Sequence, residues 1–63
     1  SYECIFNFLK EEGIEPQKLV VFTDGYPWNT WGDPNYCETL WIIHSNPNPE
    51  PEFGDWVPYQ LAA

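Results

Sequence analysis

The sequence has very few basic residues. Two lysines stand against ten aspartate and glutamate residues, which gives a formal net charge of −8 at pH 7. Such a charge repels the phosphates of nucleic acids and of anionic lipids, so neither nucleic acid nor membrane is expected as a direct partner. Divalent cations and basic protein surfaces are the natural counterparts of an acidic chain. Because the acids are scattered, a simpler role in solubility also fits them.

Cysteine and histidine are scarce as well. Cys4 and Cys37 are too few for a disulfide scaffold, so free thiols in a reducing compartment, the cytoplasm, are the simpler expectation, and a single bridge stays open. Neither cysteine belongs to a CxxC pair, and a chain with one histidine cannot contain the His-Glu-x-x-His zinc motif. The apolar runs are far shorter than the roughly 20 residues of a membrane span, so a soluble chain is expected.

Aromatic residues, by contrast, are abundant. They make up 19% of the 63 residues, and hydrophobic residues make up 43%. Disordered chains are poor in both types, so a packed core is predicted. A chain of this length buries only about 60% of the surface that its unfolded form exposes. Residues 1–63 are therefore expected to form a single domain of marginal stability.

An amphipathic helix is predicted over residues 1–12. Ser1 is a suitable capping residue, and Gly13 is suited to end the helix. Four apolar residues fall on one face at helical spacing, which is typical of a helix that packs against a sheet. These residues are Tyr2, Ile5, Phe6 and Leu9.

Three apolar runs predict strands at residues 19–22, 40–43 and 56–59. The first two are continuous, as in strands buried on both faces of a parallel sheet, and Pro58 places the third at a sheet edge. The predicted fold is α/β, with one helix on a short, mainly parallel sheet of about three strands. One helix covers one face, so the other needs cover from the 26–38 loop, a protein partner, an upstream segment of the same polypeptide or another copy of the chain.

Thr23, Asp24 and Gly25 directly follow the first predicted strand. In open α/β sheets ligands bind at the carboxyl ends of the strands, and a carboxylate beside a hydroxyl at that position is a ligand set for a hard cation such as Mg²⁺. Gly25 allows the backbone to turn tightly. Asp-Gly is also common in ordinary turns, and one carboxylate does not complete a site for a cation that takes six oxygens.

The run from Leu19 to Gly25, four apolar residues followed by Thr-Asp-Gly, resembles the strand and third metal-site loop of von Willebrand factor A (VWA) domains. The order of the other segments agrees over nearly the whole chain. An amphipathic helix precedes this run, a Leu-Trp-Ile-Ile strand follows it, and a Phe-Gly turn leads to the last strand. The chain is similar to the VWA-like domains at the C-termini of bacterial and phage predicted metallopeptidases.

The resemblance implies that residues 1–63 are the C-terminal part of a Rossmann-like, three-layer VWA domain. It also implies a protein-interaction module whose metal-ion-dependent adhesion site holds Mg²⁺ in the intact domain. Three loops build such a site, and this sequence matches only the third, with Asp24 as the ligand and Thr23 beside it. Catalytic residues are not expected in this chain. A peptidase activity of the parent family would need a zinc motif upstream.

The predicted loop over residues 26–38 is rich in aromatic residues. Tyr26, Trp28 and Trp31 lie near Asp24 in the sequence and are typical of partner-binding surfaces. The alternative is a lid in which Trp28 and Trp31 fold over the sheet. His44 has two interpretations of the same kind. It is either a metal or acid–base group near Asp24 or a hydrogen-bonded residue at a strand end.

A function of another class stays open. A small acidic protein, complete in itself, would bind and inhibit a basic partner by mimicking the charge of a nucleic acid. Residues 46–52 alternate with proline, which predicts an extended surface connection in either case.

Overall fold

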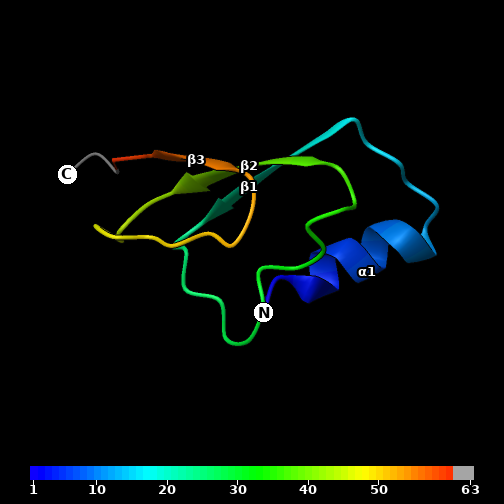
Figure 1. Cartoon of the computed structure of the whole chain (residues 1–63), viewed down its shortest axis with the longest axis horizontal. Helices are drawn as coiled ribbons and strands as arrows, with labels where there is room; N and C mark the ends of the chain where they lie inside the picture. Colours follow the sequence, from blue (N-terminus) through cyan, green and yellow to red (C-terminus); the bar gives the residue numbers. More distant parts are fainter. Residues whose placement is uncertain (61–63) are drawn as a thin grey trace.

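The computed structural model describes residues 1–60 of the chain. These residues form helix α1 (Glu3–Glu11) and strands β1 (Lys18–Thr23), β2 (Glu38–Ile43) and β3 (Asp55–Pro58). The strands make one parallel sheet in the order β1-β2-β3 (Figure 1). The predicted mixed α/β fold, with one helix on a short parallel sheet of three strands, is therefore confirmed.

Helix α1 begins at Glu3, later than predicted, and the residue before it contacts a distant loop. Tyr2, not Ser1, occupies the N-cap position. The backbone N–H of Tyr2 donates a hydrogen bond of 3.2 Å to the carbonyl of Thr30. The Ser1 hydroxyl still accepts a hydrogen bond from the N–H of Glu3, at 3.2 Å. Within residues 1–60, no helix has the length and apolar character needed to cross a lipid bilayer.

The end of α1 follows its predicted stop signal. Gly13 has a φ of 67°, a left-handed conformation that glycine adopts without the strain of a side chain. Its N–H donates to the carbonyl of Lys10 at 3.2 Å, and the N–H of Ile14 donates to Leu9 at 2.9 Å. This pair of bonds is the Schellman pattern, which satisfies carbonyls that the last helical turn leaves free.

The core lies between α1 and one face of the sheet, which we call the inner face. Its strand residues are Val21, Trp41 and Ile43, and Phe6 of α1 packs against them. Trp41 is at the centre and is completely buried. Its indole N–H donates a hydrogen bond of 2.9 Å to the carbonyl of Phe53, so the polar atom of this ring is satisfied in the core.

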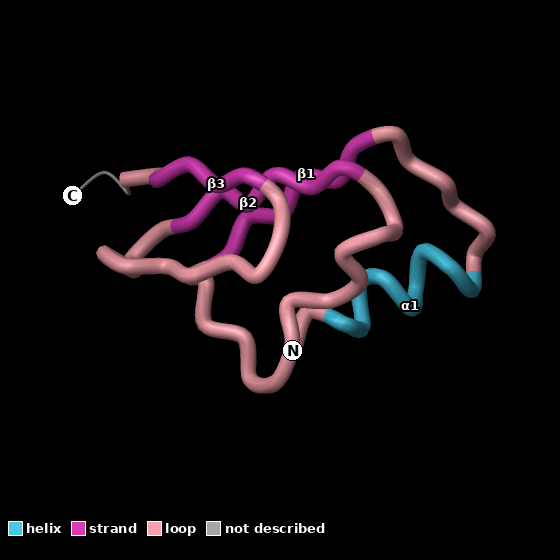
Figure 2. The backbone as a smooth tube through the Cα atoms, in the orientation of Figure 1, coloured by secondary structure: helices cyan, strands magenta, loops and turns pink. Residues whose placement is uncertain are grey.

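Both connections between strands also lie on the inner face (Figure 2). Trp31, from the connection over residues 24–37, packs on Trp41 with ring centroids 4.8 Å apart. Phe53, from the connection over residues 44–54, packs on the same ring at 5.7 Å. Parallel crossovers have one handedness, so connections that step across a sheet in the same direction cover the same face.

The opposite face of the sheet, which we call the outer face, is uncovered within residues 1–60. It carries six apolar side chains, Val20, Phe22, Leu40, Ile42, Val57 and Tyr59. Val20 is 46% exposed and Phe22 is 67% exposed. The prediction that the first strand is buried on both faces is therefore wrong for this chain. The aromatic loop does not supply the missing cover, because it packs on the inner face.

Candidate interaction site at the carboxyl end of the sheet

The chain turns sharply where β1 ends. Oδ1 of Asp24 accepts a hydrogen bond of 3.1 Å from the N–H of Tyr26, which closes the turn. Gly25 has a φ of 73°, and a Cβ there would lie only 3.1 Å from the side chains of Ile43 and Asn46. Glycine therefore fits this position for both its conformation and its size. The carboxylate of Asp24 is exposed beside it.

Thr23 fixes this turn to its surroundings. Its hydroxyl oxygen lies 2.6 Å from the phenolic oxygen of Tyr2 and accepts a hydrogen bond of 3.2 Å from the N–H of Gly25. Its carbonyl accepts a hydrogen bond of 3.0 Å from the N–H of His44. The hydroxyl of Thr23 is thus engaged within the protein, and Asp24 is the side chain of this pair that faces solvent.

Among residues 1–60, Asp24 is the one carboxylate in the turn after β1 that is open to a cation. No group of three His, Cys, Asp or Glu side chains that could hold a metal ion occurs among residues 1–60. Mg²⁺ takes six oxygens in a nearly ideal octahedron. Asp24 fits the role of one ligand in such a set, and the other oxygens would come from water or from a segment outside residues 1–60.

His44 follows β2 at the same edge of the sheet. Its Nδ1 lies 3.1 Å from the hydroxyl oxygen of Ser45, and its backbone N–H continues the ladder to β1. The ring is half-buried. These contacts agree with the simpler interpretation of His44 as a hydrogen-bonded residue at a strand end.

A hollow opens next to the turn after β1. It has a volume of about 290 Å³, and its lining includes Tyr26, Trp31, Asn48 and Glu50. Asn46 also lines the hollow; its amide donates to the carbonyl of Gly25 at 3.3 Å and its oxygen accepts from the N–H of Asn48 at 3.1 Å. The two loops that follow β1 and β2 are therefore tied together, with aromatic and acidic groups around the opening.

The three predicted contact residues of the aromatic loop have different environments. Trp28 is 94% exposed and Tyr26 is 59% exposed, so both are available to a partner. Trp31 is only 4% exposed, because its ring fills the core between Tyr2 and Trp41. The loop thus combines both interpretations. Trp31 covers the inner face, and Trp28 projects into solvent.

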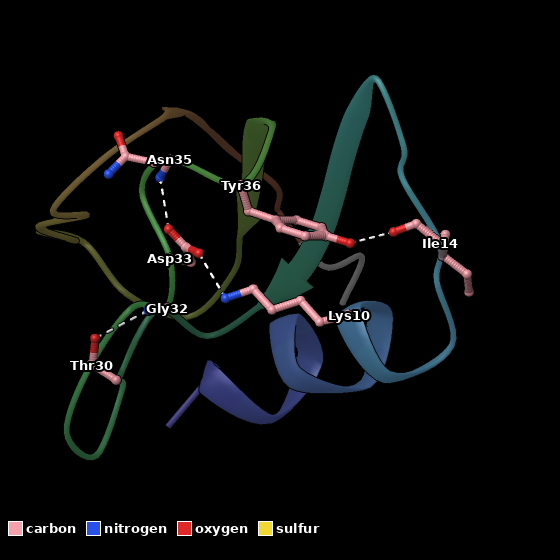
Figure 3. A network of polar contacts seen from close by, with 7 residues as sticks. All are labelled: Lys10, Ile14, Thr30, Gly32, Asp33, Asn35 and Tyr36. Atoms are coloured by element: carbon pink, nitrogen blue, oxygen red, sulfur yellow. Dashed lines mark hydrogen bonds and ion pairs between the residues drawn. The ribbon is translucent and has the colours of Figure 1, made fainter.

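Polar contacts that the sequence did not reveal fasten this loop to α1 and to the segment that follows α1 (Figure 3). The ammonium of Lys10 lies 2.8 Å from Oδ2 of Asp33. The N–H of Asn35 donates to Oδ1 of the same carboxylate at 2.9 Å, and the hydroxyl of Tyr36 donates to the carbonyl of Ile14. The hydrogen bond from Lys10 lowers the pKa of Asp33, and the bond from Asn35 lowers it further. The helical position of Lys10 did not indicate which acid it would meet.

The fold and this site define an α/β protein with an open parallel sheet and an exposed acidic and aromatic surface at the carboxyl ends of its strands. No protein-family model, no curated protein and no solved structure matches the chain. The function must therefore be inferred from the residues and the geometry themselves.

Proposed function

We propose that this chain is a protein-interaction module of VWA type, the C-terminal part of a metal-ion-dependent binding domain. The observation that carries the proposal is the position of Asp24. It is an exposed carboxylate at the carboxyl end of β1, which is an edge strand of the sheet in residues 1–60. In open α/β sheets the ligand site lies at the carboxyl ends of the strands, where the strand order reverses.

The topology supports this proposal. One half of a doubly wound sheet has three parallel strands in sequence order, and the connections between them cover one face. The order β1-β2-β3, with α1 and both connections on the inner face, agrees with such a half. The other half would pair along the free edge of β1. The strand order would then reverse beside Asp24.

In the proposed intact domain, Asp24 supplies one oxygen ligand to Mg²⁺, and two loops of the other half supply further ligands. An acidic group of the partner completes the coordination. Tyr26 and Trp28, which are exposed on the adjoining loop, are the proposed contact residues around this point. Catalysis is not part of the proposal, and the parent family's peptidase activity would belong to another segment.

Calorimetric titration of Mg²⁺ into the native polypeptide that contains this sequence tests the role of Asp24. Asp24→Asn is expected to weaken Mg²⁺ binding by at least about tenfold, because a ligand oxygen is lost. Glu11→Gln, which removes an exposed carboxylate from α1, is the matched control and should leave the affinity unchanged. Equal affinities for Asp24→Asn and the unaltered protein would refute the proposed metal site.

The alternative, a self-contained acidic inhibitor of a basic partner, is favoured by the distribution of charge. Nine of the ten acidic residues are exposed, and the remaining one, Asp33, is paired with Lys10. The intact mass of the native protein separates the two functions. A native monomer of 7.4 kDa that unfolds cooperatively would favour the inhibitor. A longer polypeptide with an upstream Asp-x-Ser-x-Ser loop would favour the VWA-type module.

A further inference from the structure

The outer face is the largest feature of the structure that the site at Asp24 does not use. Its side chains form one continuous apolar surface, because the rings of Phe22 and Tyr59 meet edge to face with centroids 6.2 Å apart. β2 lies between β1, which carries Phe22, and β3, which Tyr59 directly follows, so these two rings meet across the outer face. A connected apolar surface of this kind is typical of an interaction site.

The dimensions of the outer face suit a single helix. Neighbouring strands lie about 4.8 Å apart, so three strands span about 10 Å between the outer two, which is close to the diameter of an α-helix. A stable association of two folded chains usually buries about 800 Å² on each partner. Six apolar side chains offer on the order of half that area. The outer face is therefore well sized for one helix and small for a dimer of this chain.

The charge around the outer face further restricts the occupant. Glu38 lies in phase with Leu40 along β2, and Asp55 is the register partner of Leu40, so both acids lie at the amino end of this face. Lys18 is the register partner of Glu38 and lies at the same end, so the two carboxylates and one ammonium leave this end with a net charge of −1. The ion pair found among residues 1–60 joins Lys10 to Asp33 and leaves these two acids without a salt bridge. A second copy of the chain would bring eight further negative charges, whereas a basic segment would be attracted.

We propose that the outer face binds an amphipathic helix of a partner protein. The helix has an apolar stripe that packs on Phe22 and Ile42, and lysine or arginine residues at the end that lies over Glu38 and Asp55. This inference rests on the proposed function as an interaction module, but it does not involve Mg²⁺ or Asp24. The partner's helix provides the cover that parallel sheets receive from helices on both faces.

Three synthetic helical peptides test this proposal by calorimetry with the full 63-residue chain. The first has a leucine stripe with lysine flanks, the second has the same stripe with glutamate flanks, and the third has lysine flanks with a scrambled stripe. The first peptide is expected to bind at least about tenfold more tightly than either of the others, since it alone provides both the apolar and the electrostatic match. Equal binding of the second or third peptide would refute the proposal.

Variants of the chain locate the binding surface. Phe22→Ser is expected to weaken binding of the first peptide by about tenfold or more, because it removes the most exposed ring of the outer face. Phe8→Ser is the matched control, because Phe8 is 55% exposed on α1, away from this face, and its loss should not change binding. Amide NMR spectra check that both variants fold. An unchanged affinity of a folded Phe22→Ser variant would overturn the proposal.

Two further measurements test how much the acids Glu38 and Asp55 contribute to peptide binding and whether this binding depends on Mg²⁺. The double substitution Glu38→Gln and Asp55→Asn should weaken binding severalfold and reduce its dependence on salt, whereas Glu11→Gln should do neither. The first peptide should bind the chain with equal affinity in Mg²⁺ and in EDTA. If the proposed metal site at Asp24 proved wrong, the binding of the peptide to the outer face would therefore be unaffected. A concentration-dependent dimer that Phe22→Ser abolishes would assign the outer face to a second copy and contradict the proposal.

Discussion

Val21 and Phe22 are neighbours in β1, yet they belong to different regions of the molecule. Val21 is on the inner face and is 9% exposed, whereas Phe22 is on the outer face and is 67% exposed. Both are apolar, so residue type does not explain the difference. The inner face is buried around Val21 and along β2, where α1 and both connections cross it, whereas Trp56 of β3 on the same face is 40% exposed. Coverage of a parallel sheet is thus decided by the paths of its connections.

The largest effect is expected inside the aromatic loop, which covers the inner face through Trp31. Trp31→Ala should lower the free energy of unfolding by about 3–5 kcal/mol, because a large buried ring is lost from the core. Trp28→Ala, the matched control, should change it by less than about 0.5 kcal/mol, because Trp28 is in solvent. Urea unfolding followed by circular dichroism measures both. Similar losses would mean that the two tryptophans do not differ in burial.

Gly32 tests how closely the same loop approaches α1. Gly32 has a φ of 114°, and a Cβ there would overlap the ring of Phe6. Gly32→Ala should therefore cost about 2–4 kcal/mol, from backbone strain and from overpacking together. At Gly13 the φ is also positive, but a Cβ would meet no atom within 4 Å, so Gly13→Ala should cost only about 1 kcal/mol. Equal losses of stability for Gly32→Ala and Gly13→Ala would show that Gly32 is not in close contact with the ring of Phe6 on α1.

Serine substitutions at adjacent positions of β1 compare the two faces directly. Val21→Ser should destabilise the chain by about 2 kcal/mol, since a polar hydroxyl enters the core. Phe22→Ser should alter stability by no more than about 0.5 kcal/mol and should reduce the binding of a hydrophobic dye. Chemical denaturation and dye fluorescence give the two values. A large loss of stability with Phe22→Ser would mean that the outer face is covered in solution.

The smallest effect concerns the ion pair that holds the loop to α1. The folded-state pKa of Asp33 is lowered by Lys10, so the pair adds stability above the unfolded-state pKa of about 3.9 and loses it as the pH falls through the folded-state pKa. Asp33→Asn should therefore be less stable than the unaltered chain near pH 6, and the difference should shrink below about pH 4. Urea midpoints measured across this range test the prediction. A constant difference would exclude the titration of Asp33 as its source.

The sequence was sufficient to predict the positions of the elements. Apolar runs marked residues 19–22 and 40–43, which lie within β1 and β2, and Pro58 indicated the edge strand β3. Strand positions follow from local hydrophobic patterns. The hydrogen bond between Tyr2 and Thr30 at the start of α1 was not predictable, because it joins segments far apart in the chain.

The sequence could not show which face of each strand would be covered. A continuous apolar run looks the same whether one face or both are buried, and the difference depends on the tertiary path of the connections. The burial of Trp31 and the pairing of Lys10 with Asp33 depend on that path too. The position of Asp24 at the carboxyl end of β1 was predictable, because it follows directly from the strand. Its role in metal binding stays a prediction.

The sheet in residues 1–60 contains no hairpin, and this has a consequence for the rate of folding. Residues 24–37 separate β1 from β2, and residues 44–54 separate β2 from β3. Each ladder therefore forms only after a long loop has closed, and this entropy loss slows folding relative to a sheet built from tight turns. During synthesis, a nascent chain that has emerged as far as Ile43 already contains both strands of the first ladder. It still lacks Phe53, so the Trp41 ring gains its contact with Phe53 only when the second connection has left the ribosome.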